Sequence, residues 1–184
     1  VRLAIAMDFV RGKDLGEHLE ENPAFSEISR AVPFFAKVLD AFAHADAKGL
    51  VHRDIKPSNI MVTTEGEPVV LDFGIAKDTQ NLEQSLTGTS ALLGSRPYMS
   101  PEQVSGRELD PRSDIYSFGV TCYQLLCGEP PFRGATAVQI AMQHLKNSPP
   151  PLHERNPQIP KTLCRLVHRM MAKRRSLRYQ SAEE

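Results

Sequence analysis

Apolar side chains recur along most of this chain at the spacing of α-helices. In residues 26–48 they fall every three or four positions, and Gly49 follows, which is typical of an amphipathic helix and its end. Residues 114–126 are apolar on all sides after a polar start, so we expect a helix buried in the core. Pro33 is expected to lie in the first turn of its helix or to kink it. The same spacing predicts three further helices, at residues 14–19, 136–145 and 160–171.

Short apolar runs predict β-structure near the N-terminal end of the chain. Residues 3–7, which are bounded by Gly12, are typical of a buried strand. Residues 60–62 and 69–71 flank the turn sequence Glu65-Gly66-Glu67, so they predict a hairpin. The predicted fold class is therefore α+β and mainly helical.

Two ends and one internal stretch are unusual for a complete domain. The chain starts at Val1, immediately before the apolar run of the first predicted strand. Residues 181–184 look like the first turn of a further helix, so we expect the sequence to be a piece of a longer one. Residues 78–95 are rich in Ser, Thr and Gly and predict a long loop, of a length that is often functional.

Composition and charge narrow the class of protein. The 184 residues are 41% hydrophobic and 24% charged, which is ordinary for a globular domain. Lys and Arg number 22, as do Asp and Glu, and this zero formal charge argues against a dedicated nucleic-acid binder. We expect no membrane segment and a cytoplasmic location, because the apolar runs are too short to span a bilayer. Three cysteines are too few and too irregular for a disulfide framework or a zinc site: Cys122, Cys127 and Cys164.

Three short motifs carry the candidate chemistry. Residues 52–59 read His-Arg-Asp-Ile-Lys-Pro-Ser-Asn, residues 72–74 read Asp-Phe-Gly, and residues 100–102 read Ser-Pro-Glu. This set resembles the catalytic loop, the metal-binding motif and the Ala-Pro-Glu motif of protein kinases, in the bacterial eukaryotic-like serine/threonine group. The resemblance covers essentially the whole chain. It implies that residues 1–184 are a partial kinase domain, a kinase-like C-lobe with a small β-hairpin at the nucleotide cleft.

The resemblance also implies a role for each residue of the catalytic loop. Asp54 would be the catalytic base, and Lys56 would place a cation on the transferring phosphoryl group. Asn59 and Asp72 would supply the hard oxygen ligands that Mg²⁺, or Mn²⁺, prefers. His52 is expected to be a packed structural residue.

The long loop matches the activation loop of the kinases that the chain resembles. Thr87 and Thr89 are candidate phosphorylation sites, and both could equally be plain loop residues. Arg53 stands where it could pair with such a phosphate and order the loop.

Four further residues match positions that support the site. The Ser95 hydroxyl could bond the catalytic Asp and Lys, and Arg178 matches the arginine that pairs with Glu102. Asp114 would brace the backbone of the catalytic loop, with the alternative that it caps the buried helix.

An ATP site follows from the same resemblance. The sequence Met-Asp-Phe-Val-Arg-Gly that begins at Met7 looks like the hinge that holds adenine, with Met7 as gatekeeper. Backbone groups of Asp8 and Val10 would face the base. Met61 and Leu71 would close the pocket from below.

The implied function is transfer of the γ-phosphate of ATP to Ser or Thr of a protein substrate. The Gly-rich loop, the ATP-contacting Lys and its Glu partner are not among the 184 residues, so we expect this chain alone to bind Mg·ATP weakly and to phosphorylate nothing measurable. Two alternatives stay open. One is a degenerate kinase lobe that acts as a binding or scaffold module, with residues 136–145 as a partner surface. The other is a phosphotransferase for small molecules, a class that usually lacks the segment at residues 100–102.

Overall fold

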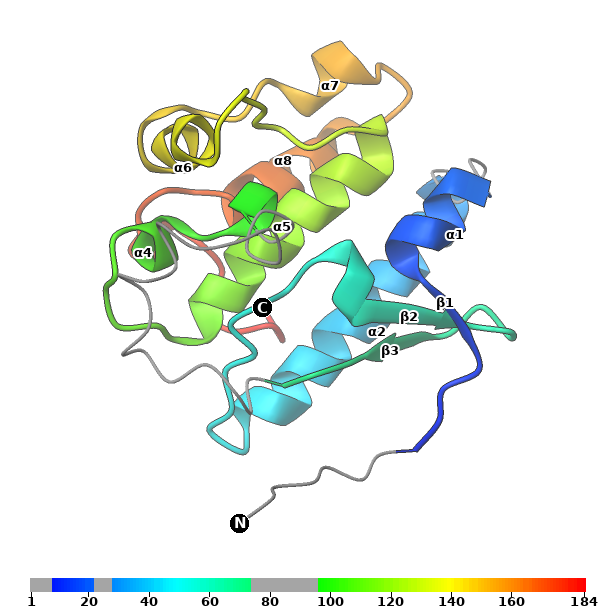
Figure 1. The fold of residues 1–184 in the computed structure, drawn as a ribbon. Coiled ribbons are helices and arrows are strands. Elements are labelled where there is room, and N and C mark those ends of the chain that lie inside the picture. Colours follow the sequence, from blue (N-terminus) through cyan, green and yellow to red (C-terminus); the bar gives the residue numbers. More distant parts are fainter. Residues whose placement is uncertain (1–7, 22–27, 74–95) are drawn as a thin grey trace.

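The computed structural model of the chain describes residues 8–21, 28–73 and 96–184, and within them it confirms a mainly helical α+β fold (Figure 1). The α-helices are α1 (Leu15–Glu21), α2 (Ile28–Asp46), α4 (Pro101–Val104), α5 (Pro111–Cys127), α6 (Ala137–Lys146), α7 (Leu152–Arg155) and α8 (Lys161–Met170). The strands are β1 (Gly12–Asp14), β2 (Ile60–Thr63) and β3 (Pro68–Val70). The described residues also contain three short 3₁₀ turns, η2 (Pro57–Asn59), η5 (Arg96–Tyr98) and η6 (Arg175–Leu177).

The strands form one antiparallel sheet in the order β1-β2-β3. The predicted hairpin is confirmed, with Ile60 opposite Val70. The strand β1 was not predicted; it pairs Gly12 with Thr63 at the outer edge of β2. Gly12 is required there, because a Cβ at this position would lie 2.1 Å from the backbone oxygen of Val62. The strand predicted at residues 3–7 lies outside the described residues.

Helix α5 runs through the middle of the molecule, with α2 on one side and α8 on the other (Figure 1). Thirteen of its seventeen residues are buried, as the apolar pattern predicted. The helix begins three residues earlier than expected, at Pro111, because the side chain of Asp110 caps it by accepting a hydrogen bond from the Arg112 N–H. Asp114 is therefore not the cap. Gly128 ends the helix in the left-handed conformation.

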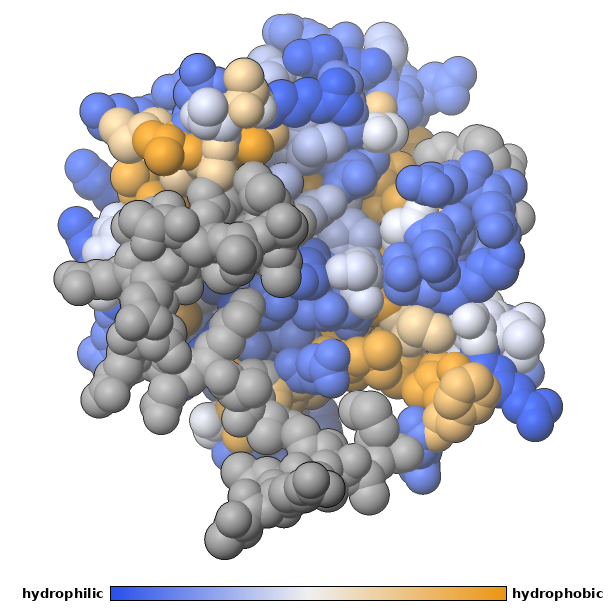
Figure 2. All heavy atoms as spheres, viewed as in Figure 1, coloured by the Kyte–Doolittle hydropathy of each residue, from blue (hydrophilic) through white to orange (hydrophobic). Residues whose placement is uncertain are grey.

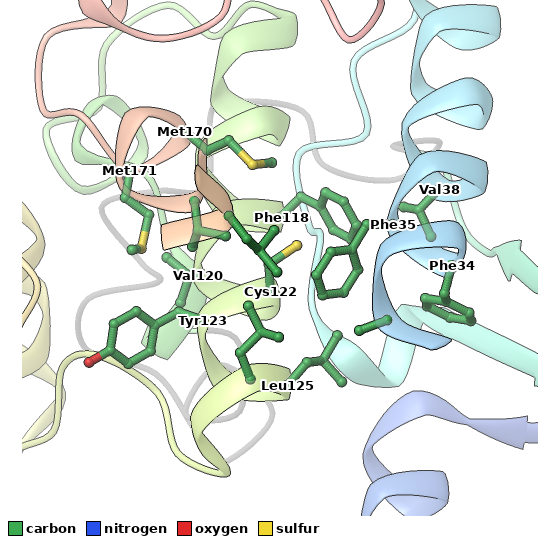
Figure 3. Packing of buried hydrophobic residues seen from close by; sticks show 14 of the residues in the cluster. Phe34, Phe35, Val38, Phe118, Val120, Cys122, Tyr123, Leu125, Met170 and Met171 are labelled. Carbon is green, nitrogen blue, oxygen red and sulfur yellow. The ribbon is translucent and has the colours of Figure 1, made fainter. Parts of the chain in front are cut away.

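The core is the contact of α5 with its two neighbouring helices (Figure 3). On the α2 side, the Phe118 ring meets Phe35 and Phe42 edge-on, with ring centroids 5.8 and 5.4 Å apart. On the α8 side, Gly119 lets the helices approach closely, since a Cβ there would lie 2.8 Å from the Cβ of Met170. The position of α5 is therefore fixed by apolar packing on both of its sides.

Several smaller predictions differ from the structure. Pro33 lies inside α2, past its first turn and with its side chain exposed, so its placement in the first turn was wrong. Helix α7, which follows the sequence Pro149-Pro150-Pro151, was not predicted. Residues 181–184 contain a turn instead of the start of a helix. Among the described residues, every helix is too short or too polar to cross a membrane.

The packing of Phe118 gives a test of the core. Phe118→Ala should lower the free energy of unfolding by about 3–5 kcal/mol, because it removes both ring contacts and leaves a cavity in the middle of the helical layer. Urea unfolding followed by circular dichroism measures this change. The control is Val138→Ala on α6, whose side chain is 61% exposed and whose loss should change stability by about 0.5 kcal/mol or less. Equal effects of the two variants would contradict the assignment of the core.

Candidate active site

The candidate catalytic loop runs from the end of α2 to β2, past the N-terminal half of α5 (Figure 1). Its backbone takes an unusual path, because Arg53 has a φ of 69°, in the left-handed region that non-glycine residues rarely adopt. Asp114 of α5 holds this path in place. Its carboxylate accepts hydrogen bonds from the backbone N–H of His52, at 2.7 Å, and of Arg53, at 2.9 Å. Burial raises the pKa of Asp114 to about 6, and the two N–H donors act in the opposite direction, so the carboxyl is mostly ionised at neutral pH.

His52 ties the loop to the end of the hairpin. Its buried ring bonds to the backbone oxygen of Leu71 through Nε2, at 2.6 Å. A carbonyl oxygen only accepts, so Nε2 carries the proton, and Nδ1 accepts from the Asp54 N–H at 3.3 Å. Burial lowers the pKa of His52, which favours this neutral form. The ring also packs on Phe73, with centroids 4.9 Å apart, so His52 is the packed structural residue that was expected.

Asp54, Lys56 and Asn59 form a compact polar cluster. The Lys56 Nζ lies 3.1 Å from Oδ2 of Asp54, and their side chains are 18% and 22% exposed. The Asn59 Nδ2 lies 2.8 Å from the backbone oxygen of Asp54 and 3.3 Å from Oδ2 of the same residue. The turn η2 brings the three together, since the Asn59 N–H donates to the backbone oxygen of Lys56. The cluster therefore joins a carboxylate, an ammonium group and an amide at a partly open surface.

The residues expected to hold a metal ion fit that task in their chemistry. The backbone oxygen of Asn59 accepts from the Leu71 N–H at 2.9 Å, which brings Asn59 beside the chain that continues into Asp72. Because the Asn59 Nδ2 is turned toward Asp54, its amide oxygen faces away from that carboxylate. The Asp72 side chain is exposed, and its backbone is left-handed, with a φ of 57°. One amide oxygen and one carboxylate suit Mg²⁺, which is usually bound by few protein oxygens and several waters.

The residues expected at the ATP site lie on one side of the sheet and in the segment before it. Asp8 is exposed and Val10 is half-buried, both ahead of β1. Met61 is half-buried on β2, on the face opposite to the buried Ile60. Leu71 is half-buried directly after β3.

A buried ion pair anchors the segment that follows the long loop. Arg178 is 0% exposed and pairs with Glu102 through two hydrogen bonds of 2.6 and 3.0 Å, as the resemblance implied. Its other N–H groups donate to three backbone oxygens, and the Ser113 hydroxyl donates to Glu102 at 2.7 Å. Burial alone would raise the pKa of Glu102, and the hydrogen bond and charge of Arg178 outweigh it, so this pKa is below its usual value.

Four of the expected residues lie outside the described part of the chain: Met7, Thr87, Thr89 and Ser95. Nothing further is assigned to them from the structure.

One contact at the loop was missed by the sequence reasoning. The Gln103 side chain donates to the backbone oxygen of Arg53 at 2.6 Å. Ser100 and Gln103 also form a capping box at the start of α4. The spacing Ser-x-x-Gln is a known signal of that capping box, and it stands in the sequence beside the Ser-Pro-Glu motif.

Fold and site together define a class of protein, a mainly helical lobe in which the loop between α2 and β2 gathers a carboxylate, a lysine and an amide. The chain belongs to the protein kinase family, because the family model described as "Protein kinase domain" matches residues 1–184.

Individual relatives agree with this family. A "Probable serine/threonine-protein kinase" of Clostridium acetobutylicum is 39% identical over 180 residues, which are 98% of this chain and 27% of that protein. The "Serine/threonine-protein kinase PknB" of Mycolicibacterium smegmatis is 37% identical, over 98% of this chain and 29% of that protein. The solved kinase domain of Mycobacterium tuberculosis PknI matches with a TM-score of 0.72 at 27% identity, over 97% of this chain and 60% of that one. The chain thus spans less than a third of the length of these curated relatives.

The buried ion pair gives a prediction about stability. Arg178→Met should lower the free energy of unfolding by about 3–5 kcal/mol, because it leaves the Glu102 carboxylate buried without its cation. The double variant Glu102→Leu with Arg178→Met should lose less than this single variant. Thermal and urea unfolding measure both.

The pH dependence of stability follows from the lowered pKa of Glu102. A carboxyl with a lower pKa in the folded state stabilises the fold above its unfolded pKa, and this contribution is lost as the pH falls through the folded value. The wild-type chain should therefore lose stability below about pH 4.5 more steeply than the double variant. Parallel curves for the two proteins would contradict the assigned role of the pair.

Proposed function

We propose that the chain is the catalytic lobe of a protein kinase that transfers the γ-phosphate of ATP to Ser or Thr of a protein substrate. The observation that carries this proposal is the cluster of Asp54, Lys56 and Asn59 on a loop that Asp114 braces from the core. The names of the relatives, which are serine/threonine-protein kinases, support it. A scaffold without catalysis has no chemical need for this cluster.

The geometry suggests a role for each side chain in the transfer. The Asp54 carboxylate would accept the proton of the substrate hydroxyl as that oxygen bonds to the γ-phosphorus and the bond to the β-phosphate oxygen breaks. Lys56 lies close enough to Asp54 to meet the transferring phosphoryl group at the same place, where its charge would offset the negative charge on the phosphoryl oxygens. Asn59 would hold the Asp54 backbone and side chain in this orientation.

Asn59 and Asp72 would hold the divalent ion that accompanies ATP. When bound, Mg²⁺ neutralises charge on the phosphate oxygens. The two residues are brought together by the hydrogen bond between Asn59 and the residue before Asp72. Asn59 ends the turn η2 directly before β2, and Asp72 lies two residues after the end of β3.

An apolar surface stands where the adenine base would bind. Figure 2 shows apolar atoms gathered over the part of Figure 1 that holds the strands and the segment leading into β1. Phe9 in that segment is 88% exposed, and Val10, Met61 and Leu71 are half-buried. Apolar side chains next to backbone polar groups suit a flat heteroaromatic ring.

Asp54→Asn tests the function directly. In the complete gene product, with Mg·ATP and casein as acceptor, this variant should reduce phosphate transfer at least 100-fold, because the amide cannot accept the hydroxyl proton. Transfer of radiolabelled phosphate, followed by phosphoamino-acid analysis, measures the rate and identifies Ser or Thr. The matched control is Asp40→Asn on the exposed face of α2, which should leave the rate unchanged.

Two results would contradict the proposal. One is transfer that persists in the Asp54→Asn variant. The other is a complete gene product that binds nucleotide or a partner protein and transfers nothing, which would favour the degenerate lobe as a scaffold.

A further inference from the structure

The side chain of Gln103 connects helix α4 with the catalytic loop. Its Oε1 accepts a hydrogen bond from the Ser100 N–H at 2.8 Å, and the backbone N–H of Gln103 donates to the Ser100 hydroxyl. Its Nε2 donates to the backbone oxygen of Arg53 at 2.6 Å, across 50 residues of sequence. The two ends of one carboxamide therefore make two different contacts, one within α4 and one outside it.

The contact with Arg53 falls on the peptide group that carries the candidate base. The Arg53 carbonyl and the Asp54 N–H belong to one planar unit. The N–H of that unit donates to His52, and the preceding N–H, that of Arg53, donates to Asp114. Gln103 holds the remaining polar atom of the unit, its oxygen. The backbone on both sides of the left-handed Arg53 is thus fixed from α5, from the loop itself and from α4.

Helix capping alone does not explain the choice of Gln. A capping box needs only an acceptor at the third helical position, and Glu serves there as well as Gln. The Nε2 group, which a Glu lacks, is the part that reaches Arg53. The amide thus performs two tasks that a carboxylate at the same place could not combine.

We propose that Gln103 is a positioning residue for catalysis, which fixes the Arg53–Asp54 peptide so that the Asp54 carboxylate faces the phosphoryl-transfer site. This inference rests on the proposed function. It also links the base to the Ser-Pro-Glu segment, since the neighbouring Glu102 is anchored to the core by Arg178. A displacement of α4 would move the peptide of the catalytic base with it.

Gln103→Glu separates the two tasks of this side chain. The carboxylate keeps the capping contact with Ser100, and it places an acceptor against the Arg53 oxygen, where a donor is needed. The matched control is Gln139→Glu. Gln139 holds the same position in the capping box of α6, is exposed, and bonds only locally in the contacts described for it, so the control has the same change of charge.

The kinetic experiment uses the complete gene product with Mg·ATP and casein. Gln103→Glu should lower kcat about tenfold, with the KM for ATP changed less than twofold, because the base is misplaced while the nucleotide contacts remain. Gln139→Glu should match the wild type in both constants. The melting temperature of Gln103→Glu should lie only slightly below that of Gln139→Glu, since both keep their capping boxes and only the first loses the donor to the Arg53 oxygen.

A second measurement needs no catalysis. In ¹⁵N–¹H spectra of the 184-residue chain, Gln103→Glu should shift the amide signals of Arg53 and Asp54, and Gln139→Glu should leave both in place. The side-chain amide protons of Gln103 should exchange slowly in the wild type. This measurement tests the contact between Gln103 and Arg53 separately from the proposed function. It gives a result even if the wild-type product transfers no phosphate.

Two outcomes would overturn the inference. One is a Gln103→Glu variant with wild-type kcat. The other is a set of Arg53 and Asp54 signals that stay unmoved in that variant. A third variant, Gln103→Met, removes both contacts, and it should show the same loss of kcat together with a lower melting temperature.

Discussion

Two hydrogen bonds from the candidate catalytic loop to one buried carboxylate hold the candidate site in its shape. Asp114 lies on α5, the helix on which the core is built, and it receives the N–H groups of His52 and Arg53. Placing a carboxylate in the core is costly unless it is hydrogen-bonded, and burial accordingly raises the pKa of Asp114 to about 6. The two N–H donors offset part of that penalty. In return, the backbone of Arg53 stays in a left-handed conformation that few side chains tolerate.

The apolar packing of α5 therefore acts on the chemistry of the loop. Phe118 fixes α5 against α2, and Gly119 lets α8 approach from the other side. Asp114 stands one turn before Phe118 on the same helix, so its carboxylate is positioned by those contacts. The rigid core thus positions the loop that carries the partly exposed Asp54, although the core residues themselves would not contact the reacting atoms.

The segment that follows the long loop is attached to the same core by independent contacts. Arg178 pairs with Glu102 and stacks over the Tyr116 ring, 4.8 Å from its centroid. The backbone oxygen of Pro97 bonds with Nε2 of His144 on α6, at 2.9 Å. Burial lowers the pKa of His144 to about 3, so this imidazole stays neutral, and its Nε2 carries the proton that the Pro97 oxygen accepts. Helix α6 and the buried Arg178 thus hold the two ends of residues 97–102 in the helical core.

The sequence predicts some elements of the fold and some candidate site residues and misses others, and each miss has a physical reason. The hairpin and the buried helix were predicted because apolar patterns report burial directly. The strand β1 was missed because its residues, Gly-Lys-Asp, have no apolar alternation, and it forms where the edge of β2 offers partners. The start of α5 was placed three residues too late, because apolar character was followed in preference to the Asp110-Pro111 capping signal. Asp54, Asn59 and Asp72 could be proposed from the sequence because they stand in short motifs.

The residues that position the loop lie outside its motif and far from it in the sequence. Asp114 lies 61 residues from Arg53, and Gln103 lies 50 residues from it. The candidate catalytic and metal-binding residues therefore lie close together in the sequence, within residues 52–72. Their geometry depends on helices that contact the loop only after folding. A substitution in α4 or α5 can change the direction of the Asp54 carboxylate without altering any residue of the motif. Since such a change leaves the motif intact, a recognisable catalytic loop is evidence for the reaction that a lobe could perform, and the contacts around Arg53 decide how well it is arranged to do so.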